Sequence, residues 1–154
     1  MYGGIPCMLA ASVPVLLALG LPFWAYWDSA VFCIFPSMAF GRIGCLLNGC
    51  CAGRPSASSG SVRLPDIRGE WARRVPVQLL ECATAIAVLA GCALARSSLA
   101  HPGMLFLVAA AGYATARIPL QRFRDQRDIR RGLDVQTVVS VAVIVLALSG
   151  LAVV

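Results

Sequence analysis

The sequence has 154 residues, of which 59% are hydrophobic and only 13% are charged. A soluble domain of this size carries about a quarter charged residues, and its apolar residues do not come in long blocks. The composition therefore excludes a water-soluble globular protein and predicts an integral membrane protein.

The net charge is +6, and all 13 basic residues are arginine. Nucleic-acid binding is not expected, because the arginines lie at the ends of apolar segments and inside them rather than on one solvated face. The guanidinium group suits bidentate recognition of phosphate. A GC-rich genome explains the absence of lysine equally well.

Five apolar segments follow one another along the chain, each with about 20 residues, the length that crosses a hydrocarbon core of about 30 Å. They predict an all-α, polytopic integral membrane protein with about five transmembrane helices in a single transmembrane domain, residues 1–154. The expected helices are 5–27, 30–50, 76–95, 103–122 and 134–154.

Short joins are expected at 28–29 and 96–102, and two polar loops at 51–75 and 123–133, the longer of them irregular. Five crossings place both polar loops on one face, together with the N-terminus. These loops, with the adjoining Arg122, hold ten of the arginines, and the positive-inside rule would make that face cytoplasmic. The orientation stays open, because arginines that bind a ligand can overrule this bias. Aromatic residues at the other end of the first segment predict an interfacial belt: Trp24, Tyr26 and Trp27.

Three charged residues on three predicted helices reach a similar depth. Arg42 and Arg117 lie about 18 Å and about 21 Å from the opposite face, and Glu81 lies about 8 Å below the loop face. Intramembrane charges usually face an interior or a wet cavity and pair with one another. Two interpretations are open: a structural tie between helices, or a polar cavity in which the spare positive charge binds the phosphate of a lipid.

Three blocks of sequence, in order, resemble the prolipoprotein diacylglyceryl transferase family. They are GRIGCLLNGCCAG at 41–53, VPVQLLE at 75–81 and ARIPLQRFR at 116–124, against family blocks of the type GRxGNFxNGE, HPxQLYE and FRxxxEFxR. The opening YGGIP is similar to the family's HGGL stretch. The resemblance implies that Arg42, Arg117 and Tyr2 are catalytic. It implies substrate-binding roles for the other matched positions: Gly3, Gly4, Asn48, Gly49, Gln78, Glu81, Gln121 and Arg124.

The resemblance implies transfer of a diacylglyceryl group from phosphatidylglycerol to the lipobox cysteine of a prolipoprotein, in a multi-pass protein of the bacterial plasma (inner) membrane. Phosphatidylglycerol, the prolipoprotein and membrane lipid are the expected partners, with no nucleic acid, no cofactor and no metal. The two arginines would hold the lipid phosphate as it leaves. The family places this site towards the extracytoplasmic face and has about seven helices, two more than are expected here.

Several family positions carry other residues in this chain: Tyr2, Cys45, Cys50, Val75, Leu80 and Gln121. A catalytically inactive paralogue that binds phospholipid or a lipoprotein is therefore an alternative. A thiol-redox membrane protein using Cys45, Cys50 and Cys51 is another. For these thiols, packing is the favoured interpretation, because CxxC spacing is absent and positions 45 and 50 differ by about 500° of helix rotation.

Overall fold

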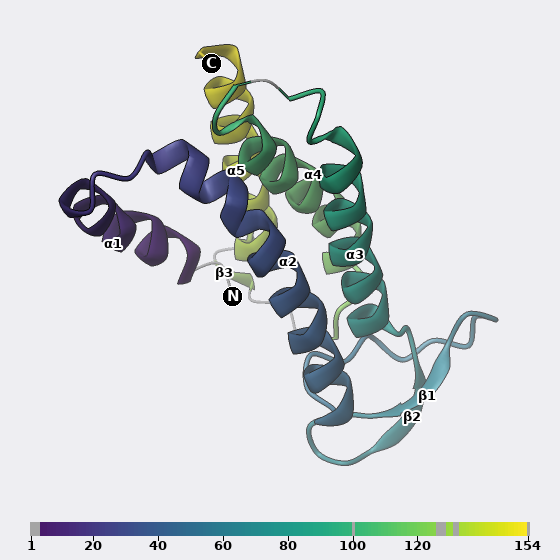
Figure 1. Ribbon diagram of the computed structural model, residues 1–154. Coiled ribbons are helices and arrows are strands. Elements are labelled where there is room, and N and C mark those ends of the chain that lie inside the picture. The colour runs from purple at the N-terminus through teal and green to yellow at the C-terminus, as the bar shows by residue number, and fades with distance from the viewer. Residues whose placement is uncertain (1–3, 100, 126–128, 131–132, 154) are drawn as a thin grey trace.

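The computed structural model describes residues 4–99, 101–125, 129–130 and 133–153. Five helices and two short antiparallel hairpins follow one another along this part of the chain (Figure 1). The helices are α1 Gly4–Ala18, α2 Phe23–Leu47, α3 Val77–Ala95, α4 Met104–Gln121 and α5 Val135–Val153. The strands are β1 Val62–Pro65, β2 Trp71–Arg74, β3 Ile129–Arg130 and β4 Leu133–Asp134.

Four of the helices, α2 to α5, are long and apolar enough to cross a membrane. They confirm the predicted all-α, polytopic membrane protein. The first helix is different, because it has only 15 residues and contains Pro14. A helix of that length spans about 22 Å, less than a hydrocarbon core of about 30 Å.

The predicted first helix, 5–27, and the predicted join at 28–29 are wrong. The break between the first two helices lies earlier, at residues 19–22, and residues 28 and 29 lie inside α2. Gly20 adopts a left-handed backbone with φ of +65°, and Pro22 precedes the first residue of α2. Glycine after a helix and proline at the start of the next are the ordinary stop and start signals. The aromatic residues of the expected belt therefore lie in the first turns of α2.

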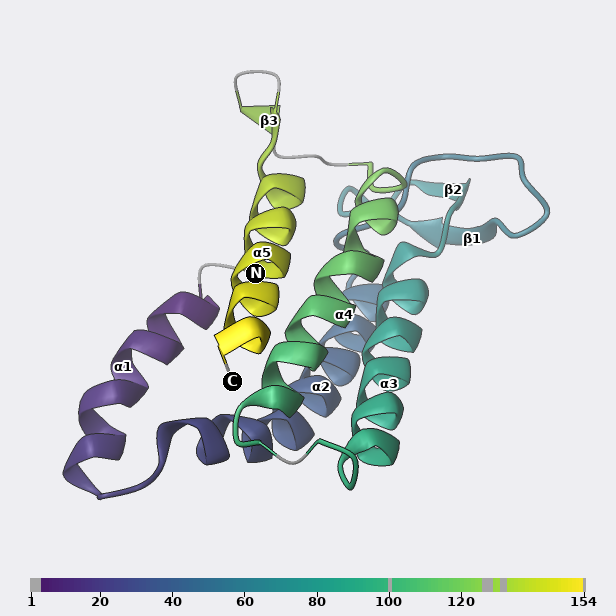
Figure 2. The same cartoon turned by 90° about the horizontal axis from the view of Figure 1, so that it is seen from above.

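Both polar loops lie at the same end of the helices, as predicted (Figure 2). A β-bridge joins Gly53 of the longer loop to Arg124 at the start of the other. Backbone hydrogen bonds on either side of it run from Arg54 N–H to Phe123 O, at 2.8 Å, and from Asp125 N–H to Ala52 O, at 3.2 Å. The join at 96–103 lies at the opposite end.

The longer loop was expected to be irregular, but it contains the β1–β2 hairpin. Five residues, 66–70, connect its strands. One Asp66 side-chain oxygen, Oδ1, accepts the N–H groups of Arg68 and Glu70, at 2.8 and 3.0 Å. Gly69 supplies the positive φ of +80°. An aspartate that bonds the backbone two residues on, followed by glycine, is a turn signal that the sequence carried.

The core lies between α2, α3 and α4 and is built mainly from small and aromatic side chains. Its buried members are Val31, Phe35, Ala39, Cys82, Ala85, Cys92, Leu105, Ala109 and Tyr113. The last helix packs mainly against α4. Its outer face is apolar and exposed, with Val138, Val141, Val145 and Leu148 at helical spacing. An apolar surface of this kind suits contact with lipid chains.

Asp28, near the start of α2, connects this helix to the start of α4, at the end of the core away from the polar loops. Its carboxylate accepts the backbone N–H groups of Gly103, at 2.6 Å, and Phe106, at 2.9 Å, in the first turn of α4. These donors have no partner within their own helix, and a carboxylate also suits the positive end of the helix dipole. A residue predicted to lie in a join is therefore a cap for another helix.

We expect Asp28→Ala to destabilise the protein by about 1–2 kcal/mol, the usual cost of losing such a cap. Asp28→Asn should be milder, because the amide oxygen still accepts one N–H group. Thermal melting in detergent measures both. Ser29→Ala, on the exposed adjacent residue, is the matched control. Equal melting temperatures for Asp28→Ala and Ser29→Ala would contradict this assignment.

Candidate functional site

A buried ion pair joins α2 and α3 below the polar loops. Arg42 of α2 and Glu81 of α3 are each 1% exposed, and the distance from Arg42 Nε to Glu81 Oε2 is 2.8 Å. This distance is that of a charge-assisted contact, although the N–H is not aligned for a hydrogen bond. The proximity predicted from helix depth is confirmed for this pair.

Arg117 reaches the same place from α4, through a residue that the sequence analysis missed. Its Nη1 donates to the hydroxyl of Tyr113, at 3.4 Å, and the Tyr113 side chain also hydrogen-bonds to Arg42. Tyr113 is buried and stacks edge-on against Phe35 of α2, which fixes its ring. The signal was available, because Tyr113 precedes Arg117 by four residues and so lies on the same helix face.

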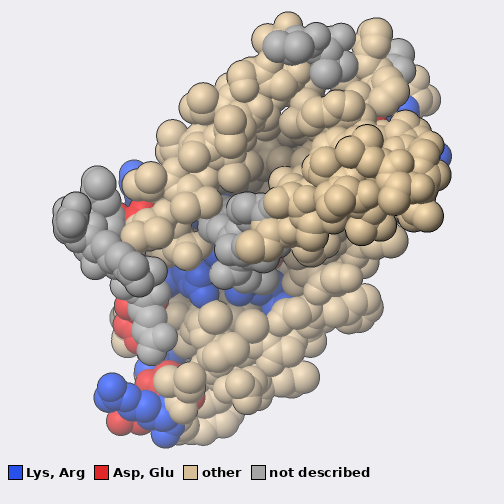
Figure 3. Space-filling model, turned by 90° about the vertical axis from the view of Figure 1, so that its left-hand side faces the viewer, with Lys and Arg blue, Asp and Glu red and all other residues tan. Residues whose placement is uncertain are grey.

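Two guanidinium groups and one carboxylate therefore meet below the loops, with a formal charge of +1 for these three side chains. The group is nearly closed to solvent, since Arg117 is 2% exposed. Figure 3 shows a face with few charged side chains, which gather mainly at the loop end, and basic side chains line a hollow in it. Such a group can stabilise an anion in surroundings where water does not compete.

Glutamines on the same helix faces surround this group. Gln78 lies three residues before Glu81, and its amide donates to the carbonyl of Cys50, at 3.0 Å. Gln121 lies four residues after Arg117, and its amide donates to Asp134 Oδ1, at 3.4 Å. The side-chain oxygens of Gln78 and Gln121 are buried and make no hydrogen bond among the described residues. They are acceptors that a ligand or water could use.

The remaining predicted site residues are more scattered. Asn48 is exposed and follows the last residue of α2. Arg124 is half-buried and pairs through its backbone with Gly53. Gly4 is the first residue of α1. Tyr2 and Gly3 lie outside the described residues.

Gly49 is required by the turn that ends α2. The N–H of Gly49 bonds to Leu46 O, at 3.3 Å, and the N–H of Cys50 bonds to Cys45 O, at 3.1 Å. This pair of bonds is a Schellman motif, which needs a left-handed residue, and Gly49 has φ of +67°. A Cβ at Gly49 would also lie 2.9 Å from the carbonyl oxygen of Asp66. The motif directs the chain from α2 into the longer loop.

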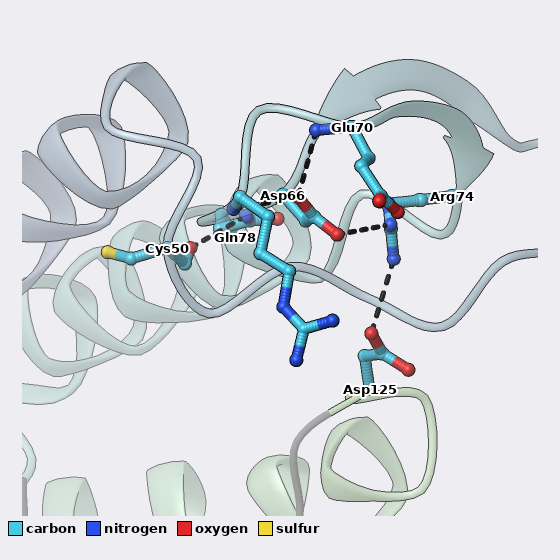
Figure 4. A network of polar contacts seen from close by, with 7 residues as sticks. Cys50, Asp66, Glu70, Arg74, Gln78 and Asp125 are labelled. Atoms are coloured by element: carbon cyan, nitrogen blue, oxygen red, sulfur yellow. Dashed lines mark hydrogen bonds and ion pairs between the residues drawn. The ribbon is translucent and has the colours of Figure 1, made fainter.

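Arg74 forms a second, separate network at the loop end of the helices (Figure 4). It is buried in β2 and donates to Asp66 Oδ2, at 2.9 Å, and to Asp125 Oδ2, at 3.2 Å. It thus ties the hairpin turn to the start of the other polar loop. A cavity of about 360 Å³ lies beside this network, and Gly49 and Cys51 also line it. From the sequence, Arg74 was predicted only to lie in a loop.

The model of the prolipoprotein diacylglyceryl transferase family matches residues 1–153. The chain belongs to this family. Among curated proteins, it is 33% identical over 123 residues to the phosphatidylglycerol--prolipoprotein diacylglyceryl transferase of Dehalococcoides mccartyi strain 195, which covers 78% of this chain and 47% of the relative. It is 31% identical over 128 residues to the enzyme of the same name from Sinorhizobium medicae, covering 80% and 45%.

A shorter match, 42% identical over 52 residues, links the chain to the enzyme of the same name from Rhodopirellula baltica, covering 34% of this chain and 11% of that relative. The chain thus spans about half the length of the transferases that it matches over most of its own length. No solved structure matches the chain significantly.

The Asp66 carboxylate holds the hairpin turn through hydrogen bonds and an ion pair with Arg74, and we expect this stabilisation to depend on pH. The Glu70 amide, assisted by the Arg68 amide and Arg74, lowers the pKa of Asp66 below its ordinary 3.8, while desolvation opposes the shift. Folding thus favours the ionised form of Asp66. The stabilisation that this carboxylate gives the folded state is fully present above pH 3.8 and is lost as pH falls through its lower pKa in the folded protein. Asp66→Asn should lower the melting temperature at pH 7, and its difference from wild type should shrink below pH 3.8.

Melting curves in detergent across this pH range measure the effect. Glu70→Gln is the control, because Glu70 is exposed and bonds to Asp66 only through its backbone in the contacts described. A difference between Asp66→Asn and wild type that does not change with pH would contradict the proposed anchor.

Proposed function

We propose that this chain transfers the diacylglyceryl group of phosphatidylglycerol to the lipobox cysteine thiol of a prolipoprotein, in the bacterial plasma membrane. The observation that carries the proposal is the convergence of Arg42 and Arg117 on the Tyr113 hydroxyl, beside Glu81. This geometry arises at the positions where the sequence resembles the family blocks. The names of the relatives support the same reaction.

The reaction is a displacement at carbon by sulfur, and it requires a stabilised leaving group. The thiol of the prolipoprotein loses its proton, and its sulfur forms a bond to the glycerol carbon that carries the phosphate ester. The carbon–oxygen bond breaks, and glycerol phosphate leaves with that electron pair and accepts the proton. Negative charge grows on the phosphate during this step, and paired guanidinium groups can stabilise it more strongly than water does.

The ion pair with Glu81 has a defined part in this proposal. It holds the Arg42 guanidinium in place through Nε, the nitrogen nearest the stem of the side chain. Tyr113 connects Arg42 to Arg117 and limits the movement of both. Preorganised charges cost no reorganisation when the phosphate leaves. Glu81 and Tyr113 are therefore positioning residues for the two arginines.

The buried glutamine oxygens support a lipid whose head group donates hydrogen bonds, as that of phosphatidylglycerol does. Gln78 and Gln121 each present an oxygen without a hydrogen bond among the described residues, and Gln136 of α5 adds a third. The head group of phosphatidylglycerol carries two hydroxyl groups, which can donate to such oxygens. A buried acceptor left unpaired costs about 1–3 kcal/mol, so a lipid that satisfies it is preferred.

We expect Arg42→Gln and Arg117→Gln each to slow phosphatidylglycerol-dependent lipidation of a lipobox peptide by the purified protein at least about tenfold. Losing a charged hydrogen-bonding partner costs about 1.5–3 kcal/mol, or roughly tenfold to 150-fold in the rate, and more where the charge grows during the step. Lysine should restore activity only in part, because it keeps the charge and loses the planar fork. The measurement is the mass of the peptide after incubation with phosphatidylglycerol.

Arg96→Gln is the matched control, because Arg96 lies at the far end of α3 with its guanidinium over the Phe32 ring. Each single change in the ion pair also leaves a buried charge, at a cost of about 3–5 kcal/mol in stability. The double variant Arg42→Gln with Glu81→Gln removes that complication. If it regains both folding and transfer, Arg42 only ties helices together. If it regains folding without transfer, the phosphate-binding role stands.

Tyr113→Phe tests the positioning role separately. The ring and its contact with Phe35 are retained, and only the hydroxyl between the two arginines is removed. We expect a lower kcat with little change in melting temperature. Saturating phosphatidylglycerol should not restore the rate. An unchanged kcat would show that the hydroxyl does not position the arginines.

Lipid binding without transfer is the second candidate, because Cys45 and Cys50 stand where the family blocks carry asparagine and glutamate. Binding of phosphatidylglycerol by the wild-type protein, lost in Arg117→Gln, with no peptide product at any concentration, would support this candidate instead.

A further inference from the structure

Three cysteine side chains converge where α2 ends. The sulfur atoms of Cys45, Cys50 and Cys51 all lie within 4.8 Å of one another, and each residue is partly buried. Positions 45 and 50 were predicted to lie on different helix faces, and this prediction is wrong. It required a continuous helix to residue 50, and α2 ends at Leu47.

The Schellman motif explains the convergence. In this motif the residue two positions beyond the helix cap folds back over the residue three positions before it, and their side chains commonly touch. Here those residues are Cys50 and Cys45, joined by the backbone hydrogen bond of 3.1 Å and by a hydrogen bond between their thiols. Gln78 holds the Cys50 carbonyl, and Figure 4 shows the Cys50 sulfur directed away from Gln78.

Cys51 completes the group from an unusual backbone conformation. Its φ is +59°, the one non-glycine residue with positive φ in the described part of the chain. L-residues outside asparagine and aspartate rarely adopt this conformation, which costs about 1–2 kcal/mol. The turn therefore holds three thiols together, two through the helix cap and one through a left-handed residue.

We propose that Cys45, Cys50 and Cys51 form a three-thiolate site for a soft metal ion, Zn²⁺ or Cu⁺. Both ions prefer thiolate ligands. At a metal–sulfur distance of about 2.3 Å, the sulfurs around one ion lie about 3.8–4.0 Å apart, so each pair has to close by about 1 Å or less. Side-chain rotation can supply this change.

The surroundings of the three thiols suit such an ion. Three thiolates with Zn²⁺ carry a charge of −1, and with Cu⁺ a charge of −2, while Cys45 interacts electrostatically with the Arg42 guanidinium. Cys51 lines the cavity of about 360 Å³ that is also lined by Asp66 and Asp125. Arg68 and Arg74 line the same cavity and Arg74 pairs with both carboxylates, so the thiols rather than the carboxylates would hold the ion. The cavity leaves room for a water as a fourth ligand of Zn²⁺. Binding releases the three thiol protons to solvent.

The site does not depend on the proposed lipid transfer, and its test is direct binding to the full chain. Reduced protein in detergent is dialysed against Zn²⁺ or, anaerobically, against Cu⁺, with a chromogenic chelator as competitor. We expect one ion per chain and a raised melting temperature. The two arms show which ion is preferred.

Two variants remove ligands without removing the turn. Cys51→Gly suits the positive φ, so the metal-free protein should melt at the same temperature as wild type or higher. The double variant Cys45→Ser with Cys50→Ser removes the other two thiols. Each should weaken metal binding by at least about tenfold, since loss of even an outer-shell partner costs 10–100-fold. Each should also lose the metal-dependent rise in melting temperature.

Cys7→Ser with Cys33→Ser is the matched control, because both thiols are exposed and lie outside the cluster. It should bind metal as wild type does. Binding below one ion per chain in the reduced wild type would overturn the proposal. So would equal binding by Cys51→Gly, which keeps its fold, or an equal loss in the control variant.

Discussion

The ion pair between Arg42 and Glu81 is the interaction on which the polar interior depends. Both side chains are almost completely buried, and two isolated charges at that depth would cost several kcal/mol each. Pairing makes their burial tolerable and fixes the register of α2 against α3. Arg117 and Tyr113 then complete the group from α4, so that three helices share one polar contact. An apolar membrane core gives such a group no alternative partners, which makes its geometry specific.

The end of α2 connects this interior to the loops above it. The Schellman motif turns the chain at Gly49, and the close approach of the Asp66 carbonyl leaves no room for a side chain there. Arg74 then joins the hairpin turn to the other polar loop through Asp66 and Asp125. One short segment therefore supports both the arginine group below and the thiol cluster beside it, and a change in the turn would affect both.

Much of the fold could be predicted from apolar runs, and the errors have local causes. The segment 5–27 was assigned to one helix because it is continuously apolar, but Gly20 and Pro22 interrupt it. Asp28 was assigned to a join because it is charged, whereas it lies inside α2 and caps α4. A carboxylate inside an apolar run can mark the end of a helix, or it can lie within a helix and bind a group on another element. Only the position of α4 decides between them.

The sequence by itself determined the all-α membrane fold, the family and the depth at which Arg42, Glu81 and Arg117 lie, because rise per residue and apolar length are properties of one helix. Only the tertiary structure decided which of these charges pair, that Tyr113 lies between the arginines, and that the longer loop forms a hairpin anchored by Arg74. It also brought three thiols together that helical periodicity would separate. Contacts between elements depend on how helices end and pack, and periodicity within one helix does not contain that information.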